Sequence, residues 1–157
     1  MTYTQSPHLT DEEIESFLKK SQVARFCSLN ADGTIHAAPV WYSYMNGQIV
    51  VATPLASRKA RNVGRNKNVT LLIDDSGTRG VWPKGVLVYG KAELNATDLA
   101  LGEFTRLCGK YFQGERAENY ARGLLSLTRW AKIVVKPERM ASFDYAKDEA
   151  YRTAVGE

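Results

Sequence analysis

The chain has 157 residues and a mass of 17.5 kDa, with 21 Lys and Arg against 17 Asp and Glu, for a formal net charge of +4. This length favours one globular domain with a real hydrophobic core, and the charged fraction of 24% is typical of folded proteins. No apolar run reaches the roughly 18 residues that a membrane span requires, and the N-terminus lacks a secretion signal. Composition thus excludes long disordered tracts and predicts a cytoplasmic protein with no membrane partner.

The first predicted elements are a helix and three strands. Thr10 and Glu13 form a capping box at the start of a helix over residues 10–21. Apolar and aromatic runs predict strands, and Asn46-Gly47 is a strong hairpin signal between the second and the third. Pro39 removes a ladder donor, which indicates a bulge or a sheet edge. The three strands are expected over residues 23–29, 34–45 and 48–53.

The rest of the chain combines strands with a pair of helices. Ser57 caps a short helix, Gly90 interrupts a strand, and Thr97 is predicted to cap the first of two helices that pack as a unit. The expected elements are a helix over 57–66, a strand over 69–74, a loop over 75–80, a strand over 86–94, the helical pair over 97–127, strands over 130–135 and 139–143, and a short charged tail over 146–157.

Strands, then a helical pair, then strands again, joined by hairpins, describe an α+β protein. Its antiparallel sheet is expected to close or nearly close into a barrel. All predicted elements up to the last strand belong to one domain over residues 1–145, with the helices at its periphery.

Several kinds of chemistry are disfavoured by the sequence. The motifs of dinucleotide sites, P-loops, serine hydrolases and zinc proteases are absent. The only histidines are His8 and His36, which excludes a multi-histidine metal site, and His36 is predicted to be an edge side chain. Cys27 and Cys108 lie far apart in sequence and are interpreted as buried thiols. We therefore assign no catalytic acid, base or nucleophile.

The positive charge is concentrated in one segment. No Asp or Glu occurs between Gly33 and Ile73. The N-terminus of a helix capped by Ser57 carries partial positive charge and free N–H groups, which favours a phosphate. A solvated basic face without a ligand is the alternative, whereas a nucleic-acid groove would need interleaved aromatic residues that are missing here. The basic residues of this segment are Arg58, Lys59, Arg61, Arg65 and Lys67.

A strand with several aromatic residues precedes this helix. Alternation places Trp41 and Ser43 on one face and Tyr42 and Tyr44 on the other. The irregularity expected at Pro39 frees backbone groups that suit the polar edge of a planar heterocycle. Burial in a core is the competing interpretation for these aromatic side chains.

Together these segments resemble the pyridoxamine 5′-phosphate oxidase-like superfamily of flavin and deazaflavin reductases. The similarity is most specific at ADGTIHAAPVW, residues 31–41, and at SRKARN, residues 57–62, with support from residues 49–53 and 69–74. It implies an antiparallel split β-barrel that forms a homodimer, with two equivalent cofactor sites in clefts between the subunits.

The resemblance also implies roles for particular residues. Thr53, Ser57, Arg58 and Lys59 correspond to the clamp on the cofactor phosphate, with Arg61 and Asn62 close behind. Pro39, Val40 and Trp41 correspond to the strand beside the cofactor ring. The residues expected to come from the second subunit are Arg129 and Trp130, or Trp82.

The implied function is a flavin-dependent oxidoreductase that transfers hydride to or from a small organic substrate. FMN is the expected cofactor, with an 8-hydroxy-5-deazaflavin coenzyme as the alternative. The arginines and C-terminal segment of true pyridoxamine 5′-phosphate oxidases are not evident, so that specific activity is not expected. A non-catalytic flavin carrier or sensor, or a haem-related split-barrel protein, are the other functions consistent with the resemblance.

Overall fold

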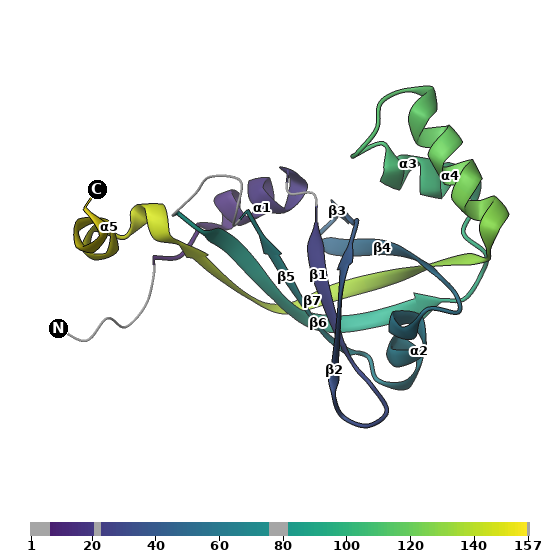
Figure 1. Cartoon of the computed structure of the whole chain (residues 1–157), viewed down its shortest axis with the longest axis horizontal. Coiled ribbons are helices and arrows are strands. Elements are labelled where there is room, and N and C mark those ends of the chain that lie inside the picture. The colour runs from purple at the N-terminus through teal and green to yellow at the C-terminus, as the bar shows by residue number, and fades with distance from the viewer. Residues whose placement is uncertain (1–6, 21–22, 76–81, 157) are drawn as a thin grey trace.

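The computed structural model describes residues 7–20, 23–75 and 82–156 (Figure 1). Its elements are, in chain order, α1 (Asp11–Lys20), β1 (Ala24–Leu29), β2 (Ile35–Val40), β3 (Ser43–Met45), β4 (Gln48–Pro54), α2 (Arg58–Arg65), β5 (Asn68–Asp74), β6 (Lys84–Asn95), α3 (Leu101–Cys108), α4 (Glu115–Leu127), β7 (Trp130–Asp144), a 3₁₀ turn (Tyr145–Lys147) and α5 (Glu149–Val155). None of the helices in these ranges is long and apolar enough to cross a bilayer.

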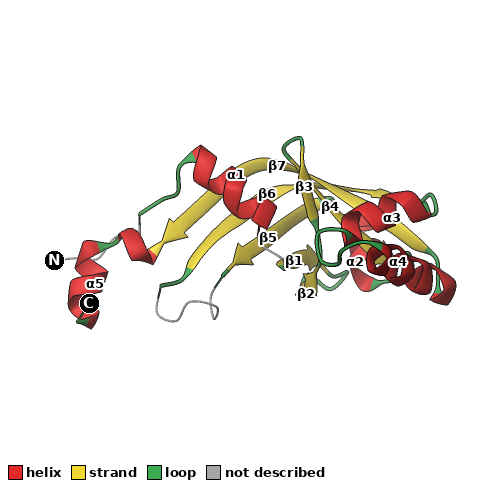
Figure 2. Ribbon diagram, turned by 90° about the horizontal axis from the view of Figure 1, so that it is seen from above, coloured by secondary structure: helices red, strands yellow, loops and turns green. Residues whose placement is uncertain are grey.

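The strands form one antiparallel sheet in the order β2-β1-β5-β6-β7-β4-β3. The two edge strands, β2 and β3, are consecutive in the chain and are separated only by Trp41 and Tyr42. Because two residues bridge only about 10 Å, the sheet must curl until its edges approach each other at this point. The result is the predicted α+β split barrel, with its helices at the periphery (Figure 2).

The barrel interior is the main hydrophobic core. Side chains that alternate along the strands fill it, among them Phe26, Leu71 and Ile133, each fully buried. Helix α1 contributes Leu18, whose carbonyl accepts a hydrogen bond of 2.7 Å from the Tyr42 hydroxyl. A second, smaller cluster lies between α3, α4 and the outer face of β4 and β7.

Local signals identified several elements correctly. Thr10 and Glu13 form the predicted capping box, with bonds of 2.8 Å and 3.2 Å between their backbone N–H groups and side-chain oxygens. Asn46 and Gly47 have φ values of 53° and 71°, as the two-residue hairpin between β3 and β4 requires. Both helices of the predicted pair are present and pack on each other. Ser21, at the end of the predicted first helix, and residues 76–80 of the predicted loop lie outside the described residues.

Two strand predictions were wrong in their extent. The strand expected over 34–45 is divided into β2 and β3, because the chain turns at Trp41 and Tyr42 from one edge of the sheet to the other. Conversely, the strands expected over 130–135 and 139–143 are one continuous strand, β7. Pro137 is accommodated there by a bulge: the pairing of β6 with β7 shifts between Tyr89 and Gly90.

Two helix predictions also need correction. Helix α3 begins at Leu101, not near Thr97, and its N-cap Ala100 makes no side-chain bond. The preceding segment stays extended because Leu99 is buried and its N–H donates to the carbonyl of Trp130 at 2.8 Å. The segment 146–157 also contains a helix, α5, whose N-cap Asp148 accepts from the N–H of Tyr151 at 2.9 Å.

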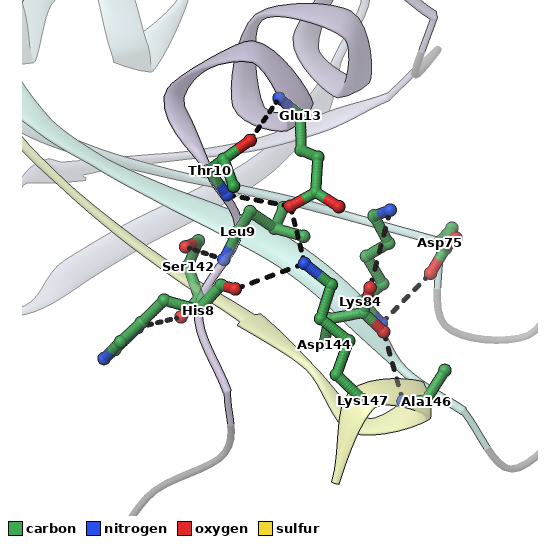
Figure 3. A network of polar contacts seen from close by, with 10 residues as sticks. All are labelled: His8, Leu9, Thr10, Glu13, Asp75, Lys84, Ser142, Asp144, Ala146 and Lys147. Carbon is green, nitrogen blue, oxygen red and sulfur yellow. Dashed lines mark hydrogen bonds and ion pairs between the residues drawn. The ribbon is translucent and has the colours of Figure 1, made fainter.

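Residues 8–13 are held beside residues 142–147 by a network of polar contacts (Figure 3). Ser142 of β7 accepts a bond from the N–H of Leu9 with its hydroxyl, and its carbonyl bonds the His8 imidazole. Lys147, after the end of β7, forms an ion pair of 2.6 Å with Glu13 of α1. These contacts stabilise the end of the barrel that lies opposite α3 and α4 in Figures 1 and 2.

Candidate functional site

A cavity of about 250 Å³ lies on the outside of the barrel, beneath the helical pair. Residues of β2 and β4 and the first turn of α2 form its barrel side, and α3 and α4 form its far wall. Four residues predicted to bind the cofactor line this cavity, and so does Trp130, which was expected to come from the second subunit but here belongs to the same chain. The lining consists of Pro39, Val40, Trp41, Ala52, Pro54, Lys59, Phe104, Leu107, Tyr120, Leu124 and Trp130.

The start of α2 is ordered by two hydroxyl groups. Ser57 is the N-cap, and its Oγ accepts from the N–H of Ala60 at 3.3 Å. Thr53, at the end of β4, is fully buried, and its hydroxyl lies 2.8 Å from that of Ser57. The Thr53 hydroxyl does not face solvent, because the residue is buried. Its contact with the Ser57 hydroxyl orients that group. The sequence Thr53-Pro-Leu-Ala-Ser57 therefore connects β4 to a helix start beside the cavity.

Among the residues that the structure describes, Lys59 is the only charged residue of the cavity wall. Its side chain is half-buried, and this burial lowers the pKa of its ammonium group. No carboxylate among the described residues forms an ion pair with it. A half-buried, unpaired cation beside an apolar cavity is suited to an anionic group of a ligand. The neighbouring Arg58 and Arg61 are exposed on the outer side of α2.

The far wall of the cavity comes from residues that were not predicted as site residues. Phe104 and Leu107 belong to α3, and Tyr120 and Leu124 belong to α4. The apolar periodicity of the helical pair is consistent with their burial, but periodicity does not indicate which surface they face. Only the packing of the pair over β4 and β7 places them at the cavity.

Aromatic rings are concentrated at one side of the cavity. The indole of Trp41 stacks on Tyr111, with ring centroids 4.2 Å apart and planes inclined by 10°. It also lies 5.4 Å from Tyr120 and 5.5 Å from Phe112. The Trp130 indole donates to the carbonyl of Leu124 at 3.0 Å, which fixes a second tryptophan in the wall.

Besides Thr53, Ser57, Arg58 and Arg61, three more predicted site residues do not line the cavity. Asn62 is buried and donates to Ser28 and Asn30, so it ties α2 to the β1–β2 hairpin. Arg129 is two-thirds exposed and pairs with Asp98 at 2.8 Å. Trp82 lies beside α5, with its ring 5.8 Å from that of Tyr151. The cysteines are free, and burial raises the pKa of both thiols.

Lys110, after α3, anchors the helical pair to the barrel. Its ammonium lies 3.7 Å from the centre of the Tyr42 ring and 3.3 Å from the Tyr42 carbonyl oxygen. Burial lowers the pKa of Lys110 from 10.5 to about 8 and raises the pKa of Tyr111 to about 12. Desolvation is the cause of the low pKa of Lys110, because burial disfavours the charged form of the amine.

The low pKa of Lys110 predicts a pH-dependent stability. Between pH 8 and 10.5 the unfolded chain binds more protons at this lysine than the folded chain does, so the free energy of unfolding should rise with pH. Urea unfolding of the wild-type protein and Lys110→Met should be compared from pH 7 to 9.5. The wild-type protein should gain stability relative to the variant across this range. Parallel pH profiles for the two proteins would show that this amine is not desolvated.

Comparison with known proteins places the chain in a family. The family model described as pyridoxamine 5′-phosphate oxidase matches residues 10–138. A search of curated proteins found no significant match.

Several solved structures share the fold at low identity, which supports the fold alone. The conserved hypothetical protein Rv2991 from Mycobacterium tuberculosis has a TM-score of 0.75 and 22% identity, over 92% of this chain and 91% of that one. An FAD-binding protein from Mesorhizobium loti has a TM-score of 0.61 and 19% identity, over 87% and 93%. An F420 reductase has a TM-score of 0.62 and 18% identity, over 80% and 94%. By its family match and its split-barrel fold, this chain belongs to the pyridoxamine 5′-phosphate oxidase family.

Proposed function

We propose that this protein is a flavin-dependent oxidoreductase that binds FMN at the cavity between the barrel and the helical pair. The observation that carries the proposal is the composition of the cavity wall, which is apolar and aromatic except for one half-buried, unpaired lysine. Such a wall suits a ligand that combines a flat ring with an anionic group. Membership of the family supports this choice, as do the names of two structural neighbours, an FAD-binding protein and an F420 reductase.

The start of α2 is proposed to hold the phosphate. Lys59 supplies a full charge, and the Ser57 hydroxyl, oriented by Thr53, supplies a hydrogen-bonding group beside it. The N-terminal N–H groups of an eight-residue helix add partial positive charge at the same point. Arg58 and Arg61 are exposed nearby and raise the local positive potential. A deazaflavin coenzyme with a longer acidic tail would engage these arginines more extensively than FMN does.

The ring is proposed to lie against the edge of β2 and the aromatic wall. Pro39 and Val40 belong to an edge strand, whose outward N–H and C=O groups have no ladder partner. Trp41 and Trp130 provide apolar faces, and the helices exclude water from the other side. Flavins carry out hydride transfer themselves, so the residues of this chain would bind, orient and dehydrate the reactants. No catalytic acid or base is proposed.

We infer that the protein is a homodimer through the outer face of β1, β2 and β5. Outward-pointing apolar residues remain partly exposed there, including Leu72, Cys27 and Ile35, which is 70% exposed. Leu72 lies opposite Arg25 and Leu87 on the neighbouring strands, near the centre of this face. The Arg25–Asp74 ion pair lies on the same face, and apolar side chains gathered on a sheet face are typically covered by another element or another chain.

Leu72→Glu is expected to convert the dimer into a monomer, because it places a carboxylate in the proposed interface, and Arg25, which lies opposite on β1, is already paired with Asp74 at 2.9 Å. Light scattering should show a mass that falls from twice the 17.5 kDa chain mass to the chain mass itself. Leu127→Glu is the matched control, since Leu127 is 78% exposed at the end of α4. A wild-type monomer, or a dimer that persists in Leu72→Glu, would contradict this interface.

The proposed function is tested by titration of the purified protein with FMN, followed by anaerobic reduction of the bound flavin. Saturable binding with micromolar or better affinity, and reduction by NAD(P)H or a reductase, are the expected results. A protein that binds FMN but never exchanges hydride would instead be a carrier or sensor. Preference for a deazaflavin would change the cofactor, and a Soret band on addition of haem with no flavin binding would overturn the proposal.

A further inference from the structure

Tyr111 makes an unusual set of contacts with the segment that joins the two edges of the barrel. Its hydroxyl accepts from the N–H of Tyr42 at 2.8 Å and donates to the carbonyl of the same residue at 3.0 Å. Its ring stacks on Trp41. One side chain from the helical pair thus binds both the backbone and the aromatic side chain of the two-residue link between β2 and β3.

The link needs such a partner for a physical reason. Trp41 and Tyr42 lie between two strands and belong to neither ladder, so their backbone groups have no sheet partners. A buried backbone group without a hydrogen bond is costly. The Tyr111 hydroxyl satisfies a donor and an acceptor at once, and this fixes the direction in which the Trp41 side chain leaves the backbone.

Trp41 reaches the cavity, whereas Tyr111 does not line it. The indole stacks on the Tyr111 ring, and the Tyr120 ring lies 5.4 Å from it with its plane tilted by 34°. A ring packed against two aromatic neighbours has little freedom to rotate, so it presents one orientation to a ligand. Such an ordered aromatic wall favours flat ligands, because it loses little side-chain entropy when the ligand binds.

We propose that Tyr111 is a positioning residue, which holds the Trp41 indole as a fixed wall for the planar ring of the ligand. This inference rests on the proposed function, since the ring it serves is that of the flavin. Tyr111 acts through Trp41 and makes no contact with the ligand of its own. Removing Tyr111 should therefore have no effect on ring binding once Trp41 has already been removed.

A double-mutant cycle with riboflavin tests this coupling, because riboflavin has the flavin ring without the phosphate. The variants are Trp41→Leu, Tyr111→Leu and their combination, with Kd measured by quenching of flavin fluorescence. Each single substitution should weaken binding about tenfold, as expected for a lost aromatic contact. The double variant should bind as weakly as Trp41→Leu alone and no more weakly. Multiplicative losses in the double variant would overturn the positioning role.

A second variant separates positioning from folding. Tyr111→Phe keeps the stacked ring but removes both hydrogen bonds to Tyr42, so its affinity should fall between those of the wild-type protein and Tyr111→Leu. Its near-ultraviolet circular dichroism should lose part of the signal that Trp41→Leu removes, while the far-ultraviolet spectrum is retained. Wild-type affinity in Tyr111→Phe, with an unchanged near-ultraviolet spectrum, would overturn the proposal. Failure of the wild-type protein to bind FMN or riboflavin would instead remove the proposed function and this inference with it.

Discussion

Lys59→Ala should raise the Kd for FMN by about 10- to 100-fold, the loss expected for a charge-assisted hydrogen bond at a partly buried site. The affinity for riboflavin should stay nearly unchanged, because riboflavin has no phosphate for Lys59 to bind. The physical basis is that Lys59 is half-buried at the cavity and has no carboxylate partner among the described residues. Isothermal titration calorimetry with both flavins measures the two constants on the same preparation.

The matched control is Lys67→Ala, which removes the same charge from an exposed position after α2. Its effect on FMN should be small and should vanish at high salt, because long-range interactions between exposed charges are screened. Equal losses of FMN affinity in Lys59→Ala and Lys67→Ala would mean that only the overall potential of the segment matters. Equal losses for FMN and riboflavin in Lys59→Ala would place the lysine at the ring and not at the phosphate.

Gly90→Ala should destabilise the protein by about 3 kcal/mol, near the upper end of ordinary single substitutions. A Cβ at residue 90 would lie 2.4 Å from the backbone oxygen of Lys136 and 3.2 Å from the Cα of Pro137. Both are backbone atoms of β7 at the bulge, so the clash cannot be relieved by a side-chain rotation. Urea unfolding should show a lower midpoint with an unchanged slope.

Gly123→Ala is the control for the general effect of adding a methyl group. Gly123 lies inside α4, and apart from the local helix backbone no described atom is within 4 Å of the Cβ that alanine would add. Alanine is the better helix former, so this variant should be more stable by about 0.5–1 kcal/mol. If Gly90→Ala were as stable as the wild-type protein, the pairing of β6 and β7 at the bulge would differ from the one described here.

Local sequence patterns were reliable where the determining contacts are local. The capping box at Thr10, the hairpin at Asn46-Gly47 and the N-cap at Ser57 each depend on residues at most a few positions apart. The same kinds of pattern gave wrong element boundaries where pairing with a strand distant in the sequence determines the extent of an element. Residues 130–143 look like two strands because Pro137 interrupts them, yet pairing with β6 carries one strand across the bulge.

In the candidate site, too, local patterns predicted some residues correctly and long-range contacts determined others. The alternation of side chains placed Trp41 and Tyr42 on opposite faces, and Tyr42 is indeed buried in the core whereas Trp41 lines the cavity. The lack of acidic residues in the segment indicated the start of α2, where Lys59 lines the cavity. Asn62 belongs to the same motif as Lys59, but its amide is committed to Ser28 and Asn30. One turn of helix separates a residue that faces the cavity from one that ties the helix to the sheet.

The sequence by itself determined the fold class of this protein, an antiparallel α+β barrel, and it predicted a phosphate-suited helix start at Ser57. Hydrophobic period, turn residues and charge distribution are sufficient for that, because each is a property of short segments. Only the tertiary structure decided what encloses the cavity. Tyr111 lies about 70 positions after Trp41, on which it stacks, and no local pattern indicates which of many apolar faces will meet. The helical pair packs over β4 and β7, where it covers apolar side chains that the sheet alone would leave exposed. This packing brings Tyr111 to Trp41.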